Sequence, residues 1–414
     1  MMKTTSMRRF VPILLGTIFE YYDVALYGFL AIPFSKLFFP THNPSISLLE
    51  TYGILALASL AKPLGALFFS HLGDKYGRKT ALSYNLIGVG IPTLLIAVLP
   101  GYDVLGFWAP CCLLIFRTFQ NFFLGGEFDG ASLYIFEHTS PKQKCFTSSL
   151  LFLCFSLGTF LASSVVTFTL QEGMPSWSWR CAFLGGGILS FIIVYLRSFL
   201  QETPIFLDLQ NESSPLSWRA FFKNMPAFFA TIFIMGSVGG CFQFCFYFLG
   251  PHLTENLKLL PFLKVSEATS LGLLLFTLSF PLGGLLGDAL GARRLLKISG
   301  CFLILLASFA LNIPFLKNHL PLVFGASGIL LGFMSPTAYV LIMDLFPKQM
   351  RYRGLSVGHT LANVIFAKNT PFLSQALFQQ TGLSIAPLFY FLFLASMTLL
   401  GLLIESLKFK KTSP

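Results

Sequence analysis

The chain has 414 residues, of which 55% are hydrophobic and only 11% are charged, and its mean hydropathy is +0.73. These values lie far outside those of a soluble globular domain, so they predict an integral membrane protein. The net charge of +11 would suit a nucleic-acid partner, but the placement of the basic residues, described below, explains this charge without one.

Twelve apolar runs are long enough to be transmembrane helices, since a helix needs about 20 mostly apolar residues to cross the hydrocarbon core. They cover residues 11–38, 51–72, 80–100, 105–137, 147–170, 181–200, 226–250, 268–287, 295–315, 320–346, 355–378 and 384–405. The first run is long, contains acidic residues and is followed by no small-residue cleavage pattern, so we expect it to remain as the first helix. The sequence therefore predicts an all-α membrane protein.

The positions of the 28 Lys and Arg residues predict the orientation. The twelve spans place 20 of these residues on the side of the two termini, five on the opposite side and three inside the membrane. Basic residues of short loops concentrate on the cytoplasmic side of a membrane. We therefore expect a multi-pass protein of the cytoplasmic (inner) membrane with both termini in the cytoplasm, and no nucleic-acid partner.

The first run carries two carboxylates, Glu20 and Asp23, near the middle of the bilayer. At about 100° per residue, both share a helix face with Tyr27. A charge at a helix centre costs about 2.5–3.5 kcal/mol on insertion scales, so membrane carboxylates face a cavity or a cation and often act in proton relays. Two interpretations stay open for each carboxylate: a proton-coupling group, or one half of a salt bridge that holds helices together.

Two further runs place cations inside the membrane. Lys62, in the middle of the second run, needs a carboxylate partner, and we expect that partner to be Asp23. In the fourth run Arg117, Gln120 and Glu127 fall on one helix face, with Glu127 about 15 Å nearer the cytoplasm than Arg117. Such a face can bind an anion at Arg117 and carry a proton at Glu127.

A short charged loop separates the second and third runs, and a weaker copy separates the eighth and ninth. The first copy reads Gly73-Asp74-Lys75-Tyr76-Gly77-Arg78-Lys79. The second copy, 214 residues later, reads Gly287-Asp288-Ala289-Leu290-Gly291-Ala292-Arg293-Arg294. A repeat at this distance indicates two halves built on one plan.

The glycines of the loop allow a tight turn between antiparallel helices. The acid, Asp74, can lie at the N-terminus of the following helix, while Arg78 and Lys79 can reach carboxylates such as Glu137. Two interpretations stay open: a cytoplasmic latch that breaks and reforms as the halves move, or a solvated hairpin that only carries positive charge.

A second echo relates the two halves. Glu137 is followed by Pro141-Lys142-Gln143, and Asp344 is followed by Pro347-Lys348-Gln349. We therefore expect an N-terminal six-helix bundle over 1–200, a polar cytoplasmic linker over 201–225 and a C-terminal six-helix bundle over 226–414.

The repeated loop resembles the signature of the major facilitator superfamily. Further matches resemble its metabolite:proton symporter branch, which includes proline/betaine and α-ketoglutarate permeases. They are Gly16 to Ala31, Lys62-Pro63-Leu64-Gly65, Arg117 to Glu127, Trp179 to Phe183, Arg197 and Glu202 to Phe206. The resemblance implies the major facilitator fold, with twelve transmembrane helices in two pseudo-symmetric six-helix bundles that rock about a central site.

Three positions depart from the pattern of that branch. Asn121 and Asp129 stand where it usually has glycine, and Lys368 replaces a small residue near the middle of the eleventh run. For Lys368 two interpretations stay open: it pairs with a carboxylate of the first half, or it binds an anionic substrate.

The expected site residues form three groups. The proton-coupling group comprises Asp23, Glu20 and Glu127. The substrate-binding group comprises Lys62, Arg117, Gln120, Tyr27, Gln243 and Lys368. The cytoplasmic gating group comprises Gly73, Asp74, Gly77, Arg78, Lys79, Glu137, Asp288, Arg293, Asp344 and Arg351.

These features predict a proton-coupled symporter of a small zwitterionic or anionic metabolite. The alternatives are an uncoupled facilitator and a sensor that binds a similar solute without transporting it. A membrane enzyme is disfavoured, because the serine pattern around Ser356 opens a membrane helix and not a strand-to-helix turn. We expect no catalytic residue, metal or cofactor, since no Cys/His cluster or phosphate-binding motif is present, and no obligate protein partner.

Overall fold

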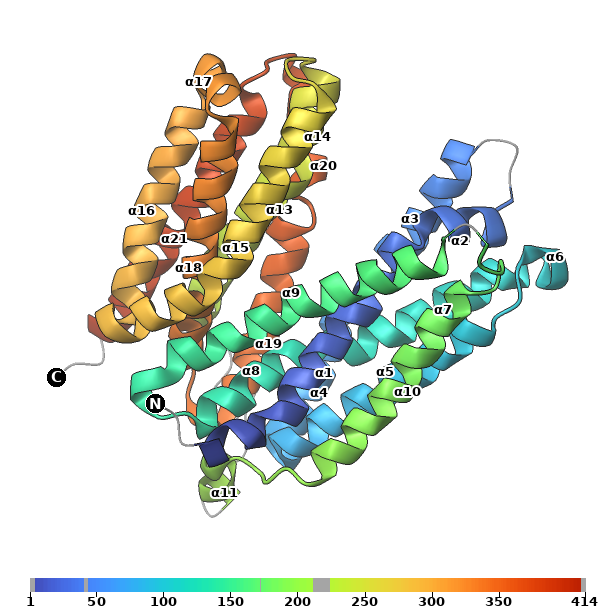
Figure 1. Ribbon diagram of the computed structural model, residues 1–414. Coiled ribbons are helices and arrows are strands. Elements are labelled where there is room, and N and C mark those ends of the chain that lie inside the picture. The colour runs from blue at the N-terminus through green and yellow to red at the C-terminus, as the bar shows by residue number, and fades with distance from the viewer. Residues whose placement is uncertain (1–3, 41–43, 172, 211–223, 411–414) are drawn as a thin grey trace. The chain divides into compact units, whose positions relative to one another are not determined.

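The computed structural model describes residues 4–40, 44–171, 173–210 and 224–410, and these residues form helices and connecting turns without a strand (Figure 1). The chain divides into two compact units. Unit 1 consists of Met1–His138 and Leu153–Ser214, and unit 2 consists of Thr139–Phe152 and Pro215–Pro414. Most of the expected linker, residues 211–223, lies outside the described residues, and the domain limits at 200 and 226 stay a prediction.

Unit 1 contains the helices from α1 to α11. They are α1 (Thr4–Phe29), α2 (Ala31–Phe38), α3 (Pro44–Ser59), α4 (Lys62–Tyr76), α5 (Arg78–Val98), α6 (Tyr102–Leu105), α7 (Trp108–Phe123), the 3-10 helix η1 (Leu124–Gly126), α8 (Glu127–His138), the greater part of α9 (Lys144–Thr169), α10 (Trp179–Ser198) and α11 (Pro204–Gln210). Within the unit, α5 packs against α10 and α7, α1 packs against α10 and α8, and α4 packs against α7 and η1.

Unit 2 contains the remaining helices and the start of α9. They are the 3-10 helix η2 (Pro141–Gln143), α13 (Met225–Gln243), the π-helix η3 (Phe244–Phe248), α14 (Leu249–Pro251), the π-helix η4 (His252–Asn256), α15 (Phe262–Leu290), α16 (Ala292–Ala310), α17 (Ile313–Asn318), α18 (Leu320–Leu345), the 3-10 helix η5 (Lys348–Met350), α19 (Arg351–Ala362), the π-helix η6 (Asn363–Ala367), α20 (Thr370–Thr381) and α21 (Ala386–Lys410). Figure 1 shows α15 beside α18, and α16 beside α18 and α21.

Nine stretches of the described residues are long and apolar enough to cross a membrane. The other three predicted spans, 105–137, 295–315 and 355–378, are helical as well. The first and third of these are interrupted by η1 and η6, and the second starts within α16, whose first turns carry three basic residues. The fold is therefore the predicted all-α membrane fold, with polar or irregular helices where charged side chains enter the bilayer.

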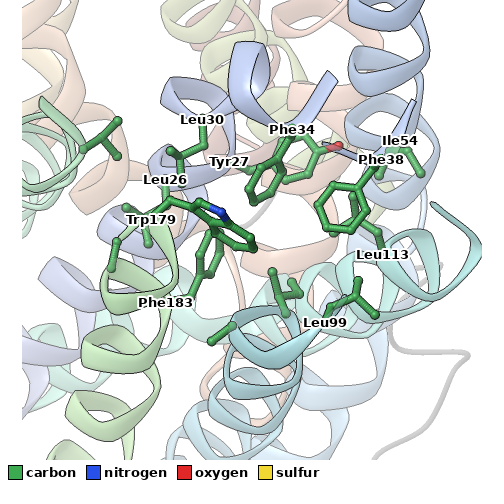
Figure 2. Close-up of a cluster of buried hydrophobic side chains, with 14 of the residues drawn as sticks. Leu26, Tyr27, Leu30, Phe34, Phe38, Ile54, Leu99, Leu113, Trp179 and Phe183 are labelled. Atoms are coloured by element: carbon green, nitrogen blue, oxygen red, sulfur yellow. The ribbon is translucent and has the colours of Figure 1, made fainter. Parts of the chain in front are cut away.

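Aromatic packing fills one end of unit 1 (Figure 2). Phe34 packs edge-on against Tyr27 and Trp179, with ring centroids 5.4 and 4.9 Å away, and stacks on Phe183 at 5.9 Å. Aromatic pairs of this kind contribute beyond their buried area. Tyr27 follows Asp23 by one turn of α1, so this core fixes the end of α1 next to the membrane carboxylates.

Candidate functional site

Asp23 on α1 lies in a closed network of buried polar side chains. Thr93 Oγ1 on α5 donates to Asp23 Oδ1 at 2.8 Å, and Gln120 Nε2 on α7 lies 3.1 Å from both carboxylate oxygens. Arg117 Nη1 lies 3.7 Å from Asp23 Oδ2 and donates to Gln120 Oε1 at 2.8 Å. The Arg117 charge and these hydrogen bonds offset part of the cost of burying this carboxylate.

These side chains meet because the site residues on each helix are three or four positions apart, which places them on the same helix face. Arg117 and Gln120 are three residues apart on α7, so both face α1. Tyr27 is four residues after Asp23, and its ring lies 4.8 Å from the Arg117 guanidinium carbon, a cation–π distance. The Tyr27 hydroxyl donates to the carbonyl of Thr51 at 2.9 Å. Four predicted site residues, Asp23, Tyr27, Arg117 and Gln120, therefore form one cluster.

The prediction that Lys62 pairs with Asp23 is wrong. Lys62 Nζ lies 3.7 Å from Glu20 Oε1, while Asp23 is paired with Arg117. Lys62 opens α4 and Glu20 lies one turn before Asp23 on α1. Helical periodicity placed both carboxylates on one face but did not say which of the two faces α4.

Glu127 pairs with a residue to which the sequence analysis gave no role. Arg197 Nη2 of α10 contacts Glu127 Oε1, Arg197 Nη1 lies 3.2 Å from Oε2, and both side chains are fully buried. The predicted face shared by Arg117 and Glu127 assumed one continuous α-helix, but η1 separates α7 from α8. Arg117 pairs with Asp23 on α1, and Glu127 pairs with Arg197 on α10.

The first charged loop is built around the buried guanidinium of Arg78. Its Nη1 donates to the carbonyl of Gly73 at 2.7 Å, and the group lies 3.3 Å from Asp74 and 3.4 Å from Glu137. The predicted contact with Glu137 is therefore present for Arg78, but in the described part of the chain no such contact is seen for Lys79. Gly77 has a φ of +106°, a conformation that side chains with a Cβ rarely adopt, and it allows the turn between α4 and α5.

The acid seen on the first backbone N–H groups of α5 is Glu202, a residue that the sequence analysis did not assign to this place. Its Oε1 accepts from the backbone N–H of Arg78 at 2.9 Å, and its Oε2 accepts from that of Lys79 at 3.1 Å. Lys79 Nζ donates to the carbonyl of Ser198 at 2.7 Å. Glu202 follows α10 and lies 124 residues after Arg78, so the loop is tied to a distant part of the chain.

The second loop repeats the turn but uses its acid differently. Gly291 has a φ of +90°, as expected from the repeat. Asp288 accepts from the backbone N–H groups of Cys145 and Phe146 at 2.8 and 2.9 Å, so it caps the N-terminus of α9 within unit 2. Arg293 lies 3.1 Å from Glu405 on α21.

Asp344 and Arg351 are the two other predicted gating residues of unit 2. Asp344, close to the end of α18, pairs with Lys144 at 3.5 Å, and Arg351 is the buried first residue of α19. The repeated motif of an acid followed by Pro-Lys-Gln forms the same local structure in both halves. A 3-10 turn follows each acid: η2 after Glu137 and η5 after Asp344.

The remaining predicted substrate residues belong to unit 2. Gln243 is the half-buried last residue of α13, and Lys368 is exposed and directly follows η6. The sequence analysis missed a polar cluster on neighbouring helices: the Tyr339 hydroxyl lies 2.8 Å from His359 Nδ1, and Asn363 Nδ2 lies 2.8 Å from His359 Nε2. A histidine in a membrane run was the available signal.

The fold and the paired loops agree with comparisons to known proteins. The model of the Major Facilitator Superfamily matches residues 13–367. The chain belongs to that superfamily. As a superfamily member it is a multi-pass membrane transporter and not an enzyme.

Relatives in the superfamily carry small metabolites, by their names. The inner membrane metabolite transport protein YhjE of Escherichia coli (strain K12) is 31% identical over 95% of this chain and 92% of its own length. The alpha-ketoglutarate permease of the same organism is 28% identical over 96% and 92%. A putative proline/betaine transporter of Staphylococcus haemolyticus is 30% identical over 94% and 85%. The predicted relation to this branch is therefore confirmed.

Solved structures of the superfamily share the fold. The proton:xylose symporter XylE, bound to 6-bromo-6-deoxy-D-glucose, has a TM-score of 0.77 at 15% identity and covers 98% of this chain and 95% of its own. The transporter FucP in the outward conformation has a TM-score of 0.70 at 13% identity, covering 95% and 98%. At this identity the likeness establishes the fold alone.

Proposed function

We propose that the protein takes up a small solute that carries a carboxylate, together with protons, by alternating access across the cytoplasmic membrane. The solute is a zwitterion such as proline or a betaine, or an anion such as α-ketoglutarate, as the names of the relatives suggest. One observation carries the proposal: unit 1 buries three carboxylates inside its membrane helices, each opposite a cation.

The carboxylates supply the proton side of this proposal. Glu20, Asp23 and Glu127 are all fully buried. A buried carboxylate can exchange its ion-pair partner for a proton, which changes the charge of the site by one unit. A transporter needs such an exchange to link solute movement to the proton gradient.

The cations supply the solute side. Lys62 and Arg117 meet a carboxylate in a low-dielectric setting, where a charge-assisted hydrogen bond is strong. Gln120 and Tyr27 contact Arg117 through a hydrogen bond and a cation–π contact. In unit 2 the candidate solute-binding residues are Gln243 and Lys368. A neutral sugar makes no use of paired cations, which favours a solute with a carboxylate.

The charged loops supply the gate. Arg78 holds the end of α4, Glu137 of α8 and the start of α5 in one buried network. Breaking this network exposes several charges at once, which suits a two-state latch. The excess of Lys and Arg on this side supports its assignment, with both termini, to the cytoplasm.

The test is uptake of labelled proline, glycine betaine, α-ketoglutarate and citrate into proteoliposomes, with and without an inward proton gradient. We expect one compound to accumulate above its external concentration only when the gradient is imposed. The control variant is Glu50→Gln, an exposed carboxylate on α3 whose loss should leave uptake unchanged. If the solute only equilibrates, both with and without the proton gradient, coupling is contradicted and the protein is a facilitator. If the solute binds but is not taken up, the protein is a sensor.

A further inference from the structure

Glu20 differs from Asp23 and Glu127, the other two carboxylates of the predicted proton-coupling group, because no hydrogen bond to its carboxylate is present among the described residues. Among the described residues, no donor lies within hydrogen-bonding geometry of either carboxylate oxygen of Glu20, whose side chain is 0% exposed. Lys62 Nζ lies 3.7 Å from Oε1, an ion-pair distance and not a hydrogen bond. A buried carboxylate held in this way carries a desolvation cost that its contacts do not offset.

Asp23 and Glu127 are in the opposite situation. Asp23 accepts from Thr93 and Gln120, and Glu127 contacts two nitrogens of Arg197. Protonating either carboxyl group weakens hydrogen bonds from donors that already point at it. Protonating Glu20 weakens only one long ion pair.

The charges around Glu20 leave Lys62 as its deciding partner. The charged groups that act on Glu20 are Lys62, Glu127, Asp129 and Arg197. Glu127 and Asp129 both oppose a negative charge on Glu20 and Arg197 favours it, but Lys62 acts on Glu20 more strongly than any of the three. Lys62 is 29% exposed on its side chain whereas Glu20 is not exposed, so Lys62 is the member of the pair with accessible surface.

We propose that Glu20 carries the coupled proton and that Lys62 alternates between the Glu20 carboxylate and the carboxylate of the solute. This inference rests on the proposed function and assigns the coupling to one of its three carboxylates. An external proton adds to Glu20, and Lys62 keeps its own protons and its charge. The released ammonium group then pairs with the solute, and loss of the proton to the cytoplasm returns Lys62 to Glu20 and expels the solute.

The exchange fixes the charge that moves with each solute. The empty site, with ionised Glu20 and Lys62, is neutral, and adding one proton together with one carboxylate leaves it neutral. One proton per solute therefore makes transport of a monoanion electroneutral, whereas transport of a zwitterion moves one positive charge. Asp23 acts in this scheme as a positioning residue, because it holds Arg117 and Gln120 in place.

The decisive variant is Glu20→Gln, which has nearly the same shape and mimics the protonated state. We expect it to exchange labelled for unlabelled solute across the membrane at a rate within about threefold of the wild type, because Lys62 stays available. Its accumulation ratio should fall to one, whereas a gradient of one pH unit supports about tenfold accumulation per coupled proton. Lys62→Gln should lose both exchange and accumulation, and Lys62→Arg should keep exchange.

Two controls separate this inference from the proposed function. Asp23→Asn should keep the requirement for a proton gradient, whatever its rate, and Glu50→Gln should match the wild type. If the wild type ignores the gradient, the proposed function itself fails. If the wild type is coupled but Glu20→Gln still accumulates solute about tenfold, or Asp23→Asn alone loses coupling, the proton is not carried by Glu20.

A second measurement does not depend on transport by the variants. Solute binding to detergent-purified protein should take up a proton from a weakly buffered solution in the wild type and in Asp23→Asn. This proton uptake should be absent in the Glu20→Gln variant, provided that the variant binds solute and has the melting temperature of the wild type. Proton uptake of equal size in Glu20→Gln contradicts the inference, as does loss of solute exchange in a Glu20→Gln protein that remains folded.

Discussion

The buried pair of Glu127 and Arg197 gives a prediction that can be worked out from its geometry. Both side chains are fully buried, and Arg197 uses two nitrogens on the carboxylate while also donating to the carbonyl of Leu82. Removing one member leaves the other as an uncompensated buried charge, which costs about 3–5 kcal/mol. We therefore expect Glu127→Gln and Arg197→Met each to lower the free energy of unfolding by about 3–5 kcal/mol.

The double variant separates the pair from its surroundings. It contains neither charge, so we expect its loss to be smaller than the sum of the two single losses by about 1–3 kcal/mol. The assay is a double-mutant cycle of denaturant unfolding in detergent, followed by intrinsic fluorescence. The exposed control, Glu50→Gln, should change the free energy by less than about 0.5 kcal/mol. The reasoning is refuted if the two losses of unfolding free energy are additive, or if each single loss is no larger than that of the control. If Glu127→Gln is as stable as the wild type but its solute uptake no longer depends on the proton gradient, Glu127 belongs to the proton-coupling group.

Three further predictions concern the loops and are read from melting temperatures of the purified protein. Gly77→Ala forces a side chain into a φ of +106° and against the Glu202 carboxyl group, so we expect the free energy of unfolding to fall by about 1–3 kcal/mol. In Gly173→Ala the φ is +92° but no atom lies within 4 Å of the added carbon, so the free energy of unfolding should fall by less. Glu202→Ala removes the acceptor at the start of α5 and should cost about 0.5–2 kcal/mol. Asp288→Ala should cost about as much at the start of α9, while Asp288→Asn, which keeps an acceptor oxygen, should cost less. Equal melting temperatures of the two glycine variants, or of either cap variant and the wild type, contradict these assignments.

The class of the protein and the position of its helices follow from the sequence because hydropathy is a local property. Each apolar run must satisfy its own backbone hydrogen bonds in lipid, so it becomes a helix almost wherever it lies in the fold. The repeated loops are local as well, since Gly77 and Gly291 set the same turn in both copies. The charged membrane residues could be named for the same reason: a carboxylate or a cation inside an apolar run needs a partner.

The identity of each partner was decided by the tertiary structure. Periodicity gives the face of a helix but not the helix that covers it, so it paired Lys62 with Asp23, whereas the fold pairs Lys62 with Glu20. The contact of Glu127 joins residues 70 positions apart, and that of Glu202 with Lys79 joins residues 123 apart.

The interruptions of the α-helices by 3-10 and π-helical segments were not predicted from the sequence either. The 3-10 segment Leu124–Gly126 and the π-helix Asn363–Ala367 rotate the side chains that follow them, so residues beyond a break no longer keep the face that 3.6-residue periodicity assigns. The sequence therefore determined which charges enter the membrane, because their cost there is a property of each residue and its run. Only the packed helices determined which charges meet, because that depends on crossings between segments far apart in the chain.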